Sequence, residues 1–234
     1  MDSSTILGLY ERQGAQATGP GGLGALQHGW QCARLARRAG ASPSLQLAAW
    51  LHDVGHLLIE ATAQEIPFAR AERPAGVARV APALVRNQHA LRGAAALLPL
   101  YGPAVSGPIA LHIEAKRCLA ALRPAYRRGL TAADHHKLAL QGGAMPLSEA
   151  RTFLQRPHAP AALRLRLWDD AARDPHVAPP SVGAALDTIA RLMRLLEIGS
   201  RASPRPPALL ARPSFLPPPS TRAGLPADGM RTAR

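Results

Sequence analysis

The feature that most constrains the fold is a His-Asp pair inside a strongly apolar segment. His52 and Asp53 interrupt the segment LQLAAWLHDVGHLL at residues 45–58, which is otherwise apolar almost all the way round a helix. A helix of this kind belongs in a protein core. Because an ionised carboxylate is seldom buried without a partner or a metal ion, the pair predicts a charged centre inside the fold. For His52 alone, a hydrogen-bonded core histidine remains the simpler interpretation.

The other apolar patterns also have helical spacing, so the expected fold class is all-α, a helical bundle. We expect Gly40 to end one helix, Ser44 to cap the helix that carries His52, and Thr131 to cap a short helix that stops at Gly142 and Gly143. The expected helices lie in residues 26–39, 45–58, 89–102, 105–122, 131–143, 161–174 and 184–197, with another beginning at 147. Residues 66–85 contain three prolines and many arginines, which predicts an exposed loop or short helical turns beside the site.

The length of 234 residues and the absence of an obvious repeat favour one domain, residues 1–198, followed by a tail, residues 199–234. Proline, serine and arginine dominate that tail, which predicts disorder. Cys32 and Cys118 are the two cysteines, and each lies in an apolar helical stretch. A disulfide framework is therefore not expected.

The same features restrict location and partners. The N-terminus lacks the basic start and apolar run of a signal peptide, and no stretch of about 20 apolar residues appears, so a cytoplasmic protein without a membrane segment is expected. The net charge is +13, and the tail accounts for part of it with six arginines against Asp228 alone. Few aromatic residues accompany the remaining basic residues, which disfavours nucleic acid as a partner. The oligomeric state stays open.

Further histidines and an acidic pair suggest that the centre binds metal. His28, His89 and His112 each lie on an expected helix with an apolar side, and Asp169 follows Trp168 on another. Four imidazoles and two carboxylates suit a pair of borderline cations, which a shared carboxylate such as Asp53 could bridge. Asp170 competes with Asp169 as the ligand, and we interpret Asp170 as a surface or supporting acid. The candidate ligands are His28, His52, Asp53, His89, His112 and Asp169.

This pattern resembles the HD superfamily, whose signature is a His, a His-Asp pair and a distal Asp. Because His89 and His112 are additional, the resemblance points to its di-metal branch. Within that branch, the chain from Leu26 to about Arg173 resembles the HD-domain oxygenases of phosphonate breakdown, relatives of myo-inositol oxygenase. The segments that carry this resemblance are LQHGWQCARLARRAGA, AAWLHDVGHLL, LHIEAKR, LALQGGAMPLSEA and LRLRLWDDAAR.

The resemblance implies a mixed-valent pair of iron ions, Fe(II) and Fe(III), with dioxygen as co-substrate, although other divalent metals are conceivable. It implies cleavage of the carbon–phosphorus bond of a small 1-hydroxyphosphonate, with release of phosphate. Asp53, His56 and Lys116 become the candidate catalytic residues. The candidate substrate-binding residues are His56, Lys116, Asp134, Gln141 and Arg166. For Lys116 and Arg166 a solvated helix face is the competing interpretation, but each shares a helix face with a candidate ligand.

The chain departs from the family pattern at several positions. Thr18 and Gly21 replace a Tyr and a Glu that close over the iron and contact the substrate amine. Asp134 and Lys137 each replace a Ser, and Ala90 replaces a Glu. These changes put the identity of the substrate in question more than the class of reaction.

Two rival functions therefore remain at this point. One is a di-metal phosphohydrolase that acts on a phosphate ester with the same ligands. The other is a binding or regulatory HD protein without turnover, which the lost Tyr and Glu would suit. Iron content and dependence on dioxygen distinguish the oxygenase from the phosphohydrolase. The presence of all six candidate ligands argues against the binding protein.

Overall fold

The computed structural model describes residues 1–16, 22–65 and 88–202, and all regular structure in these ranges is helical. The all-α class is therefore confirmed. The expected loop at 66–85, Thr18, Gly21 and residues 203–234 of the expected tail lie outside the described residues. The helices are α1 (Ser3–Gln13), α2 (Ala25–Arg38), α3 (Pro43–Leu51), α4 (Val54–Glu65), α6 (Gln88–Tyr101), α7 (Pro103–Leu122), α8 (Pro124–Arg128), α9 (Ala132–Leu140), α10 (Leu147–Leu154), α11 (Ala159–Ala171) and α12 (Val182–Ala202).

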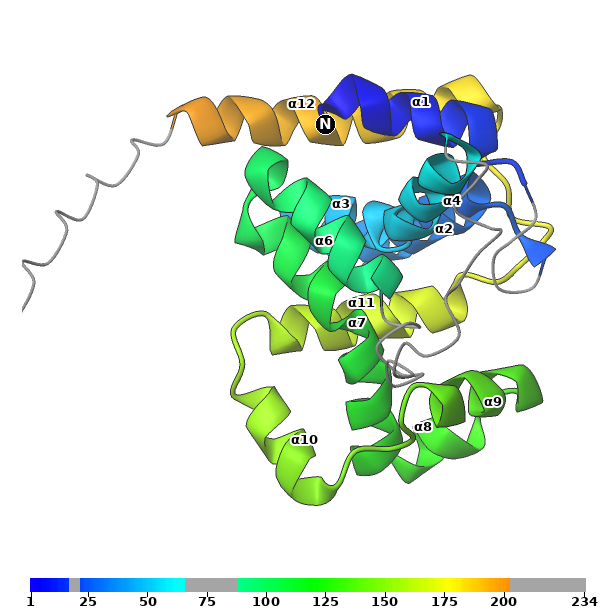
Figure 1. Ribbon diagram of the computed structural model, residues 1–234, viewed down its shortest axis with the longest axis vertical. Helices are drawn as coiled ribbons and strands as arrows, with labels where there is room; N and C mark the ends of the chain where they lie inside the picture. The colour runs from blue at the N-terminus through cyan, green and yellow to red at the C-terminus, as the bar shows by residue number, and fades with distance from the viewer. Residues whose placement is uncertain (17–21, 66–87, 203–234) are drawn as a thin grey trace, which may run out of the picture. The chain divides into compact units, whose positions relative to one another are not determined.

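Helix α7 is the element around which much of the bundle packs (Figure 1). It contacts α3, α6, α8, α10 and α11. The larger part of the core forms where α2, α3 and α12 meet, around the fully buried Trp50. A smaller apolar cluster joins α7 to α10 and α11 through residues such as Phe153. Because α7 lies between these clusters, its buried His112 and Lys116 are held in rigid surroundings.

Glycine and capping residues bound several helices as expected. Gly40 after α2 and Gly142 and Gly143 after α9 have positive φ angles, a conformation that glycine adopts without steric cost. Thr131 caps α9, as predicted. The cap of α3 was predicted wrongly, because Ser42 rather than Ser44 accepts a hydrogen bond, from the Leu45 N–H. Pro43 takes the first position of α3, where its missing N–H costs nothing.

The single helix expected at residues 45–58 is in fact two, since His52 and Asp53 form a turn between α3 and α4. Adjacent residues of a continuous helix point about 100° apart. The turn instead lets the neighbouring His52 and Asp53 side chains reach the same centre, where His52 Nε2 lies 3.6 Å from Asp53 Oδ2. The apolar pattern could not reveal the break, because it continues on both sides.

Other boundaries also differ from expectation. Helix α1 was not predicted, and the link that contains Tyr126 includes the short helix α8. Helix α12 continues to Ala202, so the proposed domain boundary at residue 198 falls inside its last turn. Among the described helices, none is long and apolar enough to cross a membrane.

Candidate metal centre

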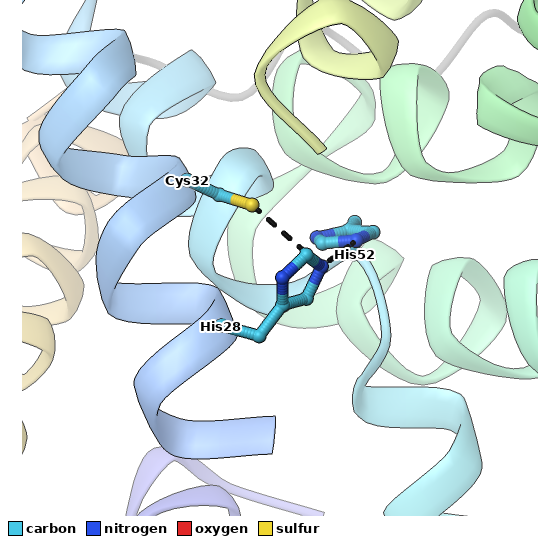
Figure 2. Close-up of side chains that lie close together, drawn as sticks. All are labelled: His28, Cys32 and His52. Atoms are coloured by element: carbon cyan, nitrogen blue, oxygen red, sulfur yellow. Dashed lines mark hydrogen bonds between the residues drawn. The ribbon is translucent and has the colours of Figure 1, made fainter. Parts of the chain in front are cut away.

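The four histidines predicted as ligands meet in the core as two pairs. Nε2 of His28 on α2 lies 3.3 Å from Nε2 of His52 in the α3–α4 turn (Figure 2). Nε2 of His89 on α6 lies 3.3 Å from Nε2 of His112 on α7. All four side chains are buried. The centre therefore depends on packing among helices that are far apart in the sequence.

Hydrogen bonds to main-chain carbonyls orient three of these rings. Nδ1 of His28 lies 2.8 Å from the Ala172 oxygen, and Nδ1 of His52 lies 3.0 Å from the Ala49 oxygen. Nδ1 of His112 lies 2.7 Å from the carbonyl oxygen three residues earlier. A ring that donates its Nδ1–H in this way leaves the Nε2 lone pair free for a metal, which is the usual arrangement of a histidine ligand.

In the first pair this arrangement brings two Nε2 lone pairs face to face. Two acceptors at 3.3 Å repel each other unless a proton or a cation lies between them. The donor set thus fits a metal ion in a way that a hydrogen-bonded core histidine does not explain. Two groups of side chains in the described part of the chain could hold an ion: His28, Cys32 and His52, and Asp53, His89 and His112.

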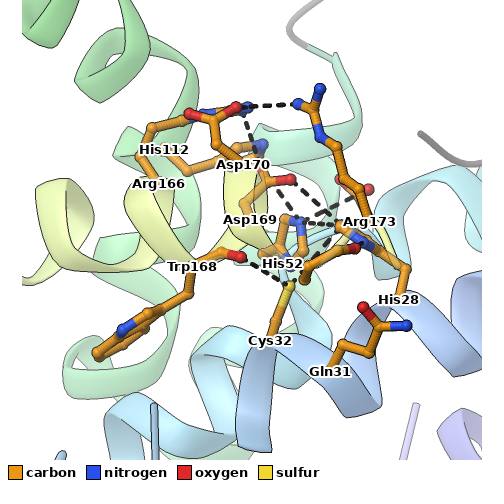
Figure 3. A network of polar contacts seen from close by, with 12 residues as sticks. His28, Gln31, Cys32, His52, His112, Arg166, Trp168, Asp169, Asp170 and Arg173 are labelled. Atoms are coloured by element: carbon orange, nitrogen blue, oxygen red, sulfur yellow. Dashed lines mark hydrogen bonds and ion pairs between the residues drawn. The ribbon is translucent and has the colours of Figure 1, made fainter. Parts of the chain in front are cut away.

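Two carboxylates complete the arrangement. Asp169 Oδ1 lies 3.2 Å from His28 Nε2, and its Oδ2 lies 3.6 Å from His52 Nε2. Asp53 Oδ2 faces His52, while its Oδ1 lies 3.7 Å from His89 Nε2. Asp53 therefore spans the two histidine pairs, as a bridging carboxylate would. Asp170, the competing candidate, instead accepts a hydrogen bond from Arg166 (Figure 3). It accepts another from the Tyr126 hydroxyl.

The charges of the centre favour a positive occupant. Burial lowers the pKa of His52, but the carboxylates of Asp53 and Asp169 outweigh it and raise this pKa to about 9. Burial raises the pKa of Asp169, but Arg166 and His52 hold it well below its usual value. Burial, together with His89 and His52, lowers the pKa of His112 to about 3. An unprotonated His112 beside ionised carboxylates is the state that metal binding requires.

Cys32 is a neighbour of the centre that sequence reasoning missed. It lies one turn after His28 on α2, and its buried Sγ is 3.8 Å from His28 Nε2 (Figure 2). The spacing of four residues was a usable signal, because it places both side chains on one helix face.

A pocket of about 450 Å³ opens beside the centre. The five predicted pocket residues, His56, Lys116, Asp134, Gln141 and Arg166, all line it. His56 stacks on the His89 ring, with centroids 4.0 Å apart and an interplanar angle of 15°. The structure thus brings the predicted substrate-binding residues together with the predicted ligands.

Next to the centre, the pocket is lined by alternating positive and negative side chains. Arg166 contacts Asp169 at 2.7 Å and Asp170 at 2.9 Å (Figure 3). Arg173, which sequence reasoning missed, donates to Asp170 at 2.9 Å and to Asp134 at 3.0 Å. Its position four residues after Asp169 and three after Asp170 was the available signal. Lys137 also lines the pocket.

Fold and site together define an all-helical protein with a buried His/Asp centre that could hold metal ions, next to a pocket rich in basic side chains. No protein-family model matches the sequence. The chain is 36% identical over 148 residues to hydroxymethylphosphonate dioxygenase of Gimesia maris, covering 63% of this chain and 67% of that protein. It is 26% identical over 175 residues to [1-hydroxy-2-(trimethylamino)ethyl]phosphonate dioxygenase (glycine-betaine-forming) of Leisingera caerulea, covering 75% and 82%. The chain belongs to this family of phosphonate dioxygenases.

Proposed function

We propose that the protein holds two iron ions and uses dioxygen to cleave the carbon–phosphorus bond of a small 1-hydroxyphosphonate, releasing phosphate. One observation carries this proposal: Asp53 lies between two histidine pairs, His28–His52 and His89–His112, beside a pocket that contains basic side chains. Family membership supplies the reaction class. A phosphohydrolase could use similar ligands, but its relatives would not be expected to be dioxygenases.

The donors divide naturally between two ions. His28, His52 and Asp169 would hold the first, His89 and His112 would hold the second, and Asp53 would serve both. Iron, unlike zinc, can exchange electrons and so supplies the oxidising chemistry that a carbon–phosphorus bond needs. Imidazole and carboxylate ligands suit iron in either oxidation state.

The side chains of the pocket would bind and orient the substrate. A phosphonate dianion would lie among Lys116, Arg166 and the other basic groups of the wall, with Arg166 presenting its planar guanidinium and Lys116 a compact charge. His56 is exposed at the edge of the pocket, stacked on His89, where it can exchange a proton with the substrate hydroxyl. Gln141 lines the same pocket, and its buried Oε1 has no hydrogen-bond partner among the described residues.

Hydroxymethylphosphonate is the first substrate to test, because the relative at 36% identity is named for it. Atom balance for its oxidation by one dioxygen gives one formic acid and one phosphoric acid. Both products leave without a further reductant, so substrate, dioxygen and phosphate should be related one to one.

The test begins with protein purified without oxygen, whose iron content is measured. Oxygen uptake and phosphate release are then followed with hydroxymethylphosphonate in the presence of ascorbate, and equal rates are expected. Two results would count against the proposal: metal-free protein, or anaerobic turnover of a phosphate monoester with none of any hydroxyphosphonate. The second would favour the di-metal phosphohydrolase.

A further inference from the structure

We infer that Arg173 is an additional phosphonate-binding residue and that Asp134 is a positioning residue, which holds Arg173 and Lys116 toward the substrate instead of binding a substrate ammonium group. The pocket should then select phosphonates that carry no positive charge. This inference rests on the proposed function and specifies its substrate class.

Both oxygens of Asp134 are already occupied. Oδ1 accepts hydrogen bonds from Lys116 Nζ and Arg173 Nη2, each at 3.0 Å. Oδ2 accepts one from the Thr131 hydroxyl at 2.7 Å and contacts Arg173 Nη1. The side chain of Asp134 is only 5% exposed. An incoming ammonium group would have to displace a cation that is already paired, so Asp134 is poorly suited to bind one.

The cations of the wall are tied together through shared carboxylates. Lys116 and Arg173 meet at Asp134 Oδ1, and Arg173 and Arg166 meet at Asp170 Oδ1. Tyr126 donates to the other oxygen of Asp170 at 2.6 Å. Three basic side chains are therefore fixed close to one another along one wall of the pocket. Fixed cations of this kind bind an oxyanion with little loss of conformational entropy.

Four cations line the pocket here, Lys116, Lys137, Arg166 and Arg173, and they outnumber the three carboxylates paired with them, Asp134, Asp169 and Asp170. Burial lowers the pKa of Lys116, and the nearby Arg166 lowers it further, although Asp134 acts in the opposite direction. Arg173 is half-buried and lines the pocket together with Lys116, Arg166 and Lys137. An anion relieves the repulsion among these groups, whereas an ammonium group increases it. Glu60 is the remaining carboxylate of the lining that is neither paired with Lys116 nor proposed as a ligand, so it serves as the control for amine binding.

Equilibrium binding tests Arg173 without turnover. Methylphosphonate, which lacks the reactive hydroxyl, is titrated calorimetrically into the iron-loaded protein and its variants. We expect Arg173→Gln and Asp134→Asn each to weaken binding at least tenfold. The loss in the double variant should be smaller than the sum of the two single losses, because both changes break the Arg173–Asp134 interaction, and what remains should reflect Lys116. Arg156→Gln, which breaks a surface ion pair with Glu114, is the matched control and should bind normally. Unchanged binding in Arg173→Gln would overturn the inference.

A milder variant keeps the positioning role of Asp134 testable if Asp134→Asn does not fold. Thr131→Val keeps the charge of Asp134 but removes two hydrogen bonds, the one to Asp134 Oδ2 and the one from the Asp134 N–H that caps α9. It should weaken methylphosphonate binding by a smaller factor than Asp134→Asn does. A Thr131→Val protein that binds normally, beside a folded Asp134→Asn protein that also does, would rule out positioning by Asp134.

Substrate selectivity tests the role of Asp134. The ratio of kcat/KM for hydroxymethylphosphonate to that for 2-amino-1-hydroxyethylphosphonate should exceed ten, and Asp134→Asn should lower both values by a similar factor through KM. If Asp134→Asn lowered kcat/KM for the aminated substrate alone, Asp134 would bind the amine. The same selective fall in Glu60→Gln would show that Glu60 binds the amine. If no phosphonate is turned over, the proposed function fails, while the methylphosphonate titration still decides whether Arg173 binds the anion.

Discussion

His28 and His52 direct their Nε2 atoms toward each other at 3.3 Å, while each ring engages a main-chain carbonyl through Nδ1. The carbonyls belong to Ala172, just after α11, and to Ala49 in α3. The orientation of both donors therefore follows from the packing of three helices. Metal binding should require little rearrangement of the folded chain.

His112→Asn should reduce the iron content from two ions per chain to one. The change removes a proposed ligand of the second ion and leaves the cluster of His28, His52 and Asp169 intact. Metal analysis after anaerobic purification measures the result, and His135→Asn, on the exposed face of α9, is the control. Two ions retained in His112→Asn would mean that this residue is not a ligand.

Cys32→Ala should retain both ions, because the proposed ligand set is complete without sulfur. The thiol lies 3.8 Å from His28 Nε2, so it is a candidate fifth donor to the first ion, beside His28, His52, Asp169 and the shared Asp53. Cobalt substitution distinguishes the two cases, since a thiolate ligand adds an intense near-ultraviolet charge-transfer band. A band that disappears in Cys32→Ala would place sulfur among the ligands.

Gly55→Ala should destabilise the fold by about 3 kcal/mol, the upper end of the usual cost of overpacking. A Cβ at Gly55 would lie 1.9 Å from the carbonyl oxygen of His89, so α6 would have to move. The displacement carries the His89 ring with it, and iron content should fall as well. Gly183→Ala, whose nearest neighbour would be 3.9 Å away, is the matched control for urea denaturation. Equal stability of the two variants would contradict this account.

The contribution of Asp134 to stability should depend on pH. Burial raises the pKa of Asp134, but hydrogen bonds from Arg173, Thr131 and Lys116 outweigh it and hold this pKa well below 3.8. A carboxylate with a depressed folded-state pKa stabilises the fold above its unfolded-state pKa, and this stabilisation is lost as the pH falls toward the folded-state value. In metal-free protein, Asp134→Asn should cost on the order of 3 kcal/mol at pH 7.

Thermal melts of the metal-free wild type and Asp134→Asn between pH 7 and pH 3 measure this difference. It should narrow below about pH 4, where the unfolded-state carboxyl takes up a proton. A constant difference across the range would show that the substitution acts through packing and not through charge.

Residues 1–202 should suffice for folding and metal binding, because they form one compact unit. Truncation after Ala202 keeps all of α12, whose Ile189 and Met193 are buried in the core. The truncated chain should match the full chain in melting temperature and iron content. A fall in either would assign a structural role to residues 203–234.

The burial of three candidate ligands could be predicted from sequence, because each lies where an apolar helix face carries an otherwise unexplained polar group. His28, His89 and His112 follow this rule, and all three are buried as the rule requires. The turn at His52 and Asp53 could not be predicted, because helix and turn fit the same run of apolar residues. Only the approach of α6 to Gly55 and the hydrogen bond from His52 to Ala49 distinguish them.

The pocket was harder to predict than the ligands. Asp134 appeared as a lone carboxylate in a phosphonate site, since its partner Arg173 is 39 residues away in the sequence. The pairing depends on how α9 lies against the end of α11, which no local pattern encodes. Thr18 and Gly21, the positions that differ most from the family pattern, lie outside the described residues.

The turn between α3 and α4 has a consequence for how the protein matures. The six candidate donors come from α2, this turn, α6, α7 and α11, and the proposed first site is complete only when α11 supplies Asp169. In a nascent chain, α11 must leave the ribosome and pack on α2 before Asp169 can reach His28. On the proposed ligand set, the first ion would bind only after α11 has docked, so chains whose synthesis stops before α11 should be unable to acquire it.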